Sequence, residues 1–119
     1  MLRTWGILFG LAFLLIGILG FVPAAAPKGL LLGIFHVNLI HNVIHLITGA
    51  VALWTGLQGT SAVRYFFQYF GIIYAIVTVL GFIYDDKDIL GFIANNAADN
   101  WLHLIVAVVS LYLGFLHKE

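Results

Sequence analysis

Cysteine is absent from this chain of 119 residues, and charged side chains are scarce. The absence of cysteine excludes disulfides, thiolate metal ligands and redox thiols. Charged residues make up 8% of the sequence, and the formal net charge is zero. Because there is no basic run and no basic excess, the sequence predicts no nucleic-acid partner. Proline occurs only twice, so helices meet few interruptions.

Apolar residues fill most of the chain instead. Hydrophobic residues make up 63% of the sequence, and the mean hydropathy is +1.10. A helix needs about 20 apolar residues to cross the hydrocarbon core of a bilayer. Four segments have this length: Trp5–Val22, Asn38–Leu57, Arg64–Tyr84 and Asn96–His117. The sequence therefore predicts an all-α bundle of four transmembrane helices, forming one integral membrane domain over residues 1–119.

The second and fourth segments resemble each other. At an offset of 58 residues, 25 aligned positions contain nine identities: Gly33, Asn38, Asn42, His45, Leu46, Ile47, Val51, Leu53 and Gly56. The first and third segments match at an offset of 61, where Phe9-Gly10 corresponds to Phe70-Gly71. Matched Asn, His and Gly residues are not expected from apolar composition alone. We predict two tandem two-helix repeats, about residues 5–57 and 64–117, lying parallel about a pseudo-two-fold axis along the membrane normal.

The apolar run that contains the second span is too long for one crossing. Gly29–Leu57 as a single helix would measure about 43 Å at ~1.5 Å per residue, against a hydrocarbon core of ~30 Å. We therefore expect a bend near residues 36–38, with Asn38 capping the spanning helix and Asn96 capping its counterpart.

Charge placement predicts the orientation of the bundle. With four spans, Arg3, Arg64 and Lys118 share one side of the membrane, and Lys28 and Lys87 share the other. The positive-inside rule then places both termini in the cytoplasm and the polar residues of the second and fourth spans near the outer face.

Those polar residues form a stripe that occurs twice. Asn38, His41, Asn42 and His45 follow at i, i+3, i+4 and i+7, which is one face of a helix. The fourth span repeats the pattern with Asn96, Asp99, Asn100 and His103. Polar groups facing lipid are costly, so both stripes are expected to face protein, water or a ligand.

Metal binding is one interpretation of this cluster. His41 and His45 have the i, i+4 spacing that presents two imidazoles on one helix face, and Asp99 and His103 repeat it. Three imidazoles and a carboxylate would complete a tetrahedral set for Zn²⁺ or a similar divalent ion. Residues expected to support these four ligands are Asn38, Asn42, Asn96, Asn100 and Tyr74, the last with its hydroxyl facing the interior.

Two other interpretations of the cluster remain open. The same side chains could form a metal-free clasp of hydrogen bonds between helices. His45 and His103 could also be axial ligands of haem or bind the magnesium of a chlorophyll-type pigment.

Functions other than ligand binding also remain open. The chain could be an accessory structural subunit of a larger membrane complex. Gly6, Gly10, Gly17 and Gly20 predict close helix approach, either inside the bundle or in a homo-oligomer. No reaction motif is present, so we do not expect an enzyme.

A family resemblance rests on the same residues. The run Leu32-Gly33-Ile34-Phe35, then Asn38, His41-Asn42, His45-Leu46 and Gly49, together with Ala98-Asp99-Asn100-Trp101-Leu102-His103-Leu104, resembles the bacterial four-helix membrane family catalogued as domain of unknown function 4383. The resemblance covers nearly the whole chain and implies a four-span protein of the bacterial cytoplasmic membrane. It implies no activity.

Overall fold

Four long helices make up most of the computed structural model, which describes residues 1–118. Each of the four is long and apolar enough to cross a membrane, so the predicted all-α class is confirmed and the chain has the make-up of a multi-pass membrane protein. The helices are α1 Leu2–Leu19, α2 Leu39–Gln58, α3 Thr60–Tyr84 and α4 Ala97–Leu111. The shorter elements are a 3₁₀ turn at Pro27–Gly29, the strands β1 Leu30–Leu31 and β2 Phe35–His36, and a π-helical end at Tyr112–Leu116.

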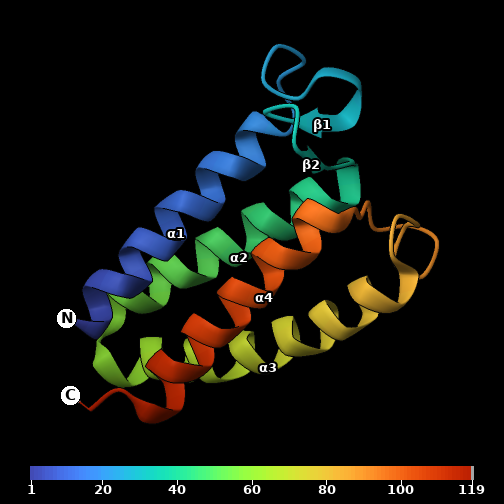
Figure 1. Ribbon diagram of the computed structural model, residues 1–119. Helices are drawn as coiled ribbons and strands as arrows, with labels where there is room; N and C mark the ends of the chain where they lie inside the picture. The colour runs from blue at the N-terminus through green and yellow to red at the C-terminus, as the bar shows by residue number, and fades with distance from the viewer. Residues whose placement is uncertain (119) are drawn as a thin grey trace.

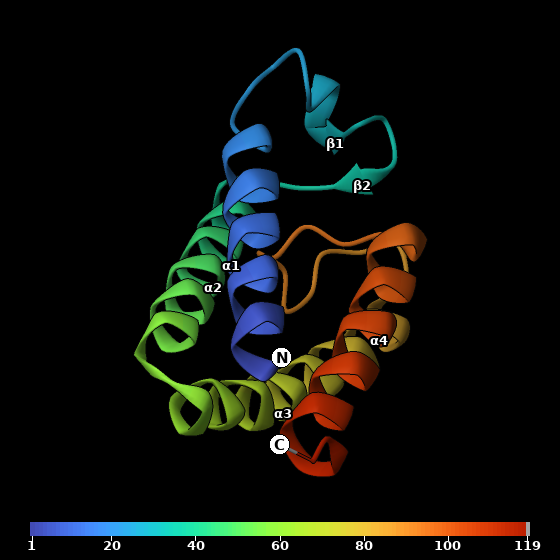
Figure 2. The same cartoon turned by 90° about the vertical axis from the view of Figure 1, so that its left-hand side faces the viewer.

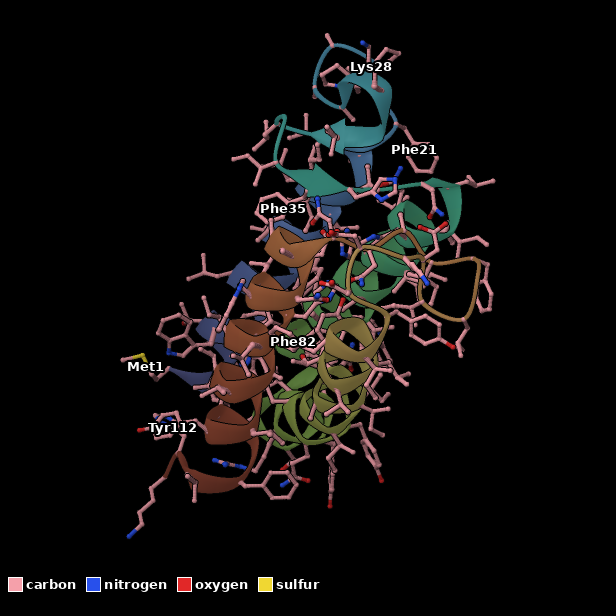
Figure 3. The ribbon with its side chains drawn as sticks, turned by 45° about the vertical axis from the view of Figure 1, so that its right-hand side comes forward. Met1, Phe21, Lys28, Phe35, Phe82 and Tyr112 are labelled. Atoms are coloured by element: carbon pink, nitrogen blue, oxygen red, sulfur yellow. The ribbon has the colours of Figure 1, made fainter. Side chains whose placement is uncertain are left out.

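The helices form two antiparallel hairpins, α1 with α2 and α3 with α4 (Figure 1). The loops that join the helices of each hairpin lie at one end of the bundle, where α2 and α4 begin. Both termini lie at the other end, beside the turn from α2 into α3 (Figures 1 and 2). Lys28 and Tyr112 mark these opposite ends in Figure 3.

Glycine allows the two helices of each hairpin to approach closely. Gly10 of α1 lies against Leu53 of α2, and Gly71 of α3 lies against Leu111 of α4. Nearer the loops, Gly20 meets the side chain of Asn42 and Gly81 meets that of Asn100, so a Cβ at either glycine would collide with the amide. The remaining glycines predicted to permit close packing, Gly6 and Gly17, are also buried between helices. These glycines therefore pack inside the bundle.

Arginines satisfy the ends of α2 and α4. Arg3 Nε donates to the carbonyl of Gly56 at 2.8 Å. Arg64 Nη1 donates to the carbonyl of His117 at 2.8 Å, beyond the π-helical end of α4. The last carbonyls of a helix lack intrahelical partners and carry its negative dipole end, which a guanidinium complements. The predicted grouping of these two arginines at one end is confirmed, and their cytoplasmic placement stays a prediction.

Asparagine caps begin α2 and α4. The Asn38 side chain accepts the backbone N–H of His41 at 2.9 Å. The Asn96 side chain accepts the N–H of Asp99 at 2.9 Å, and the Asp99 carboxylate accepts the Asn96 N–H at 3.0 Å. This reciprocal pair is a capping box. The predicted bend is confirmed because α2 starts at Leu39 and the segment before it forms the β1–β2 hairpin.

The two loops beside these caps are fastened to each other. The side-chain amide of Asn38 donates to the carbonyl of Phe92 in the second loop at 2.9 Å. The amide of Asn96 donates to the carbonyl of Ile34 in the first loop at 2.9 Å. Donors and acceptors of the two bonds correspond at the 58-residue offset of the sequence. This exchange and the matched glycine contacts support the predicted duplication; the duplication and its pseudo-two-fold axis stay predictions.

The connection between the hairpins is shorter than expected. A turn over residues 57–62 is indicated by their Gly, Thr and Ser content, but α2 ends at Gln58 and α3 begins at Thr60. Gly59 alone joins them with a φ of +156°, a conformation that glycine adopts without the clash of a Cβ. The prediction of a longer turn is wrong for that reason.

Candidate metal centre

Three histidines meet in the interior of the bundle near the looped end. His41 and His45 come from the first two turns of α2, and His103 comes from the second turn of α4. One ring nitrogen from each lies within 4.8 Å of the other two. The ring centroids of His41 and His45 are 4.4 Å apart, and those of His41 and His103 are 5.7 Å apart. The three side chains are only 2%, 3% and 4% exposed.

The three rings contain buried nitrogens that no hydrogen bond satisfies. In all three histidines Nδ1 is buried and has no hydrogen-bond partner. The His41 ring also bonds to the backbone of Ala94 and of His36. A backbone bond of this kind ordinarily orients a metal-binding imidazole.

Aromatic rings pack against two of the three histidines. The Phe13 ring packs edge-on against His45 with centroids 5.4 Å apart. The Tyr74 ring packs in the same way against His103 at 5.3 Å, and its hydroxyl forms a hydrogen bond with Thr48. The prediction that Tyr74 faces the interior is confirmed. The rings help to bury the cluster, and burial strengthens electrostatic interactions there.

Asp99 lies beside the cluster without joining it. Its side chain is 2% exposed, and the carboxylate accepts the backbone N–H groups of Asn96 and His36. Among residues 1–118, the group with ligand atoms close enough to share an ion comprises the three histidines. The carboxylate is therefore occupied in closing the start of α4, and its predicted role as a fourth ligand stays a prediction.

The asparagines predicted to support the ligands hold helices and loops. Asn100 Nδ2 donates to the carbonyl of Gly81 at 3.0 Å, which fastens α4 to α3. The Asn42 amide lies against Gly20 of α1. Asn38 and Asn96 cap their helices. All four lie within a turn of a histidine or Asp99, but their direct orientation of the imidazoles stays a prediction.

Two polar residues of this region are not predicted by the sequence pattern. Asn95 is fully buried, and its amide donates to the carbonyls of Gly81 at 3.1 Å and Asp85 at 2.6 Å. Its counterpart in the first half is Val37, so a comparison of the two repeats does not point to a polar residue at this position. Thr48, the partner of Tyr74, likewise aligns with Val106. Only the contacts reveal these two residues.

The geometry disfavours a large flat cofactor. The cavity that His45 lines has a volume of about 50 Å³. Ligand sites for sizeable organic molecules measure about 300–1,000 Å³. The three imidazoles pack against one another and against aromatic rings, which leaves no slot for a macrocycle between His45 and His103 in this structure.

Comparison with known proteins identifies one family. The family described as "Domain of unknown function (DUF4383)" matches residues 3–116. No curated protein and no solved structure matches the chain.

Proposed function

The chain belongs to the DUF4383 family, and from this premise we propose that it is a membrane protein that binds a divalent metal ion, Zn²⁺ or a similar ion, through His41, His45 and His103. The observation that carries the proposal is the convergence of three buried imidazoles within 4.8 Å of one another. Four apolar spans set this centre in a bilayer.

The unpaired nitrogens favour a metal over a clasp. A hydrogen-bonded clasp would join the imidazoles to one another or to neighbouring amides, because buried polar groups in proteins are almost always paired. Here the three Nδ1 atoms are buried without partners. A bound cation would satisfy all three lone pairs at once, and imidazole suits Zn²⁺ and neighbouring transition metals.

The expected coordination is three imidazoles with one open position. Nitrogens bound to Zn²⁺ at ~2.0–2.1 Å in tetrahedral geometry lie about 3.3 Å from one another. Nitrogens within 4.8 Å reach that arrangement through small side-chain rotations. A water molecule, or Asp99 after release from its backbone partners, would complete the set. Three protein ligands and an open position typify reactive zinc sites, whereas structural sites use four.

The proposed orientation follows from charge. Arg3 and Arg64 face the cytoplasm, both termini lie on that side of a bacterial cytoplasmic membrane, and the histidines lie in the outer half of the bilayer. A metal would then reach the site from the outer side.

A second candidate function is a structural subunit of a larger membrane assembly. The reciprocal bonds from Asn38 and Asn96 to the opposite loops favour it, because they fasten the two hairpins without any ion. In that case the histidines would only pack the bundle.

Metal content tests the first proposal. Protein purified in lipid nanodiscs without chelator should retain about one equivalent of a single transition metal per chain, measured by elemental analysis. The variant His103→Ala should lose it. His117→Ala is the matched control, because it removes a histidine at the opposite end of the bundle and should retain the metal. Sub-stoichiometric metal in the wild type after Zn²⁺ reconstitution would rule the metal centre out and leave the structural subunit.

A further inference from the structure

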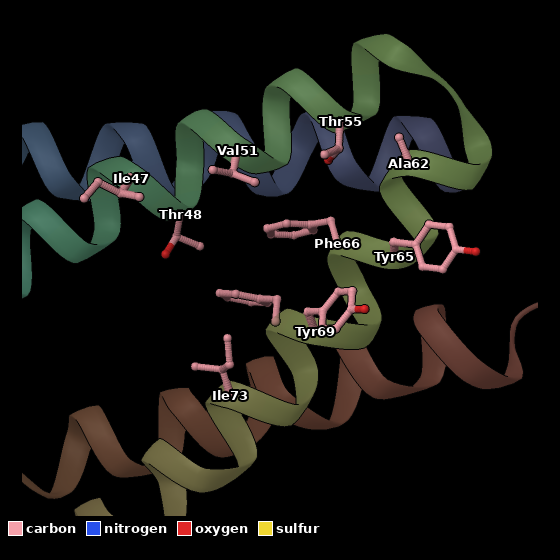
Figure 4. Close-up of a pocket in the computed structure, with 10 residues that line it drawn as sticks. Ile47, Thr48, Val51, Thr55, Ala62, Tyr65, Phe66, Tyr69 and Ile73 are labelled. Carbon is pink, nitrogen blue, oxygen red and sulfur yellow. The ribbon is translucent and has the colours of Figure 1, made fainter.

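Two apolar grooves lie between helices of different hairpins. One lies between α2 and α3 and has a volume of about 390 Å³ (Figure 4). The other lies between α1 and α4 and has a volume of about 380 Å³. Their walls correspond at the offsets of the repeat, for example Phe70 with Phe9 and Ile73 with Ala12. The grooves differ in the residues on their inner side.

The groove between α2 and α3 is backed by a completed hydrogen bond. Thr48 lines this groove (Figure 4). Its side chain is bonded to the Tyr74 hydroxyl. That bond joins the two helices in front of His103, whose ring touches Tyr74. Thr48 therefore offers no unpaired hydroxyl to a molecule in this groove.

The groove between α1 and α4 leads to a second, inner cavity. Phe13 stands here in place of Tyr74, and Val106 stands in place of Thr48, so the corresponding hydrogen bond is missing. Ile16, Phe35 and Leu102 line both the groove and the inner cavity of about 50 Å³. Phe35 lies at the end of the bundle where α4 begins (Figure 3).

The inner cavity reaches polar groups of the interior. His45 and Asp99 line it, and its other walls are apolar. The oxygens of Asp99 already accept backbone N–H groups, whereas His45 Nδ1 is buried and unpaired. Because one water occupies ~30 Å³ of the liquid, the cavity has room for one or two groups of that size. An uncharged hydroxyl fits this space, while a charged head group would be costly against apolar walls.

We propose that the groove between α1 and α4 and its inner cavity bind a single-chain lipid of the long-chain alcohol class. The apolar tail lies in the groove, and the hydroxyl hydrogen-bonds to His45. His45 belongs to the second turn of α2, close to the membrane interface where such hydroxyls reside. The site goes beyond the proposed metal function and does not require the ion. His45 is also a proposed ligand of that ion, so the hydroxyl and the metal compete for its ring, and the hydroxyl bond forms in the metal-free protein.

Photolabelling in nanodiscs tests this site. The probe is hexadecan-1-ol carrying a photoreactive diazirine in the middle of its chain, and labelled residues are mapped by mass spectrometry. We expect saturable labelling of the groove walls on α1 and α4. Unlabelled hexadecan-1-ol should compete roughly tenfold better than hexadecane, the effect of one buried hydrogen bond. Equal competition by the alkane, or by palmitate, would overturn the proposal.

Matched variants locate the lipid. Ala12→Trp fills the groove between α1 and α4 and should abolish saturable labelling. Ile73→Trp changes the corresponding position of the other groove and should leave labelling unchanged; equal loss in both variants would contradict the assignment. His45→Phe should keep the labelling but remove the preference for alcohol over alkane. The competition is run with chelator, so that no ion occupies His45. A roughly tenfold alcohol preference there supports the lipid site whether or not the metal proposal holds.

Discussion

His41 of the α1–α2 hairpin and Asp99 of the α3–α4 hairpin stand at corresponding positions, and each contacts the loop of the other hairpin. The His41 ring bonds to the backbone of Ala94, while the Asp99 carboxylate accepts the backbone N–H of His36, the counterpart of Ala94. One position therefore carries a donor ring and the other an acceptor carboxylate. Each reaches the opposite loop from the third residue of its helix.

Some contacts recur in both hairpins, whereas others differ between them. The caps, the glycine contacts and the bonds from Arg3 to Gly56 and from Arg64 to Gly114 recur in both hairpins at fixed offsets. The differences gather at the centre, where the first hairpin supplies two imidazoles and the second supplies one imidazole and Tyr74. We infer that the recurring contacts hold the bundle and that the differing ones carry its chemistry.

The largest effect is expected from variants of His41 and Asp99, which occupy corresponding positions but differ in chemistry. His41→Ala removes a proposed ligand and should weaken Zn²⁺ binding by more than ~100-fold, because even supporting residues of metal sites contribute 10–100-fold. Asp99→Ala should leave Zn²⁺ affinity within about tenfold of wild type and cost ~1 kcal/mol of stability through the lost capping box. Competitive titration against a fluorescent zinc chelator measures both. If the two variants weaken binding equally, Asp99 is a ligand.

Variants of Gly20 and Gly81, which are the same residue at corresponding positions, should destabilise the two hairpins equally. Gly20→Ala and Gly81→Ala each force a methyl group against an asparagine amide and should each cost about 1–3 kcal/mol of unfolding free energy. Replacing the asparagine of the same hairpin by alanine should recover part of the loss. Unfolding in SDS measures the free energies. A large cost at one glycine and none at the other would contradict the matched packing.

The smallest effect is expected from a single substitution that gives the second hairpin the residue type of the first. Tyr74→Phe introduces the residue type of Phe13 and removes the bond to Thr48, at a cost of ~0.6–1.7 kcal/mol for an interhelical hydrogen bond in a membrane. Zn²⁺ affinity should hardly change. The same SDS unfolding and zinc titration check both expectations, and a loss of zinc binding would place the Tyr74 hydroxyl at the metal.

Much of this scaffold follows from local sequence. The apolar lengths predict four spans, and Asn38 and Asn96 predict the caps because each stands just before a helical apolar run. The histidine stripe also predicts which faces turn inward. Arg3 and Arg64 predict the end that they share, although their bonds to the carbonyls of opposing helix ends are visible only in the structure.

The arrangement around Asp99 could not be predicted in this way. Its spacing from His103 matches that of two ligands, but the spacing does not show that its carboxylate closes a capping box. Asn95 and Thr48 lack polar counterparts in the other hairpin and bond across long stretches of sequence or to another helix. Such contacts depend on how the helices meet in space.

The chelator dependence of one variant's stability tests the metal centre most directly. A bound ion should stabilise the wild type by roughly 3–4 kcal/mol at 100–1,000 times its dissociation constant. We expect His103→Ala to melt well below the wild type when Zn²⁺ is present, and the two proteins to melt within a few degrees of each other in excess chelator. An equal difference in melting temperature with and without chelator would contradict the metal centre.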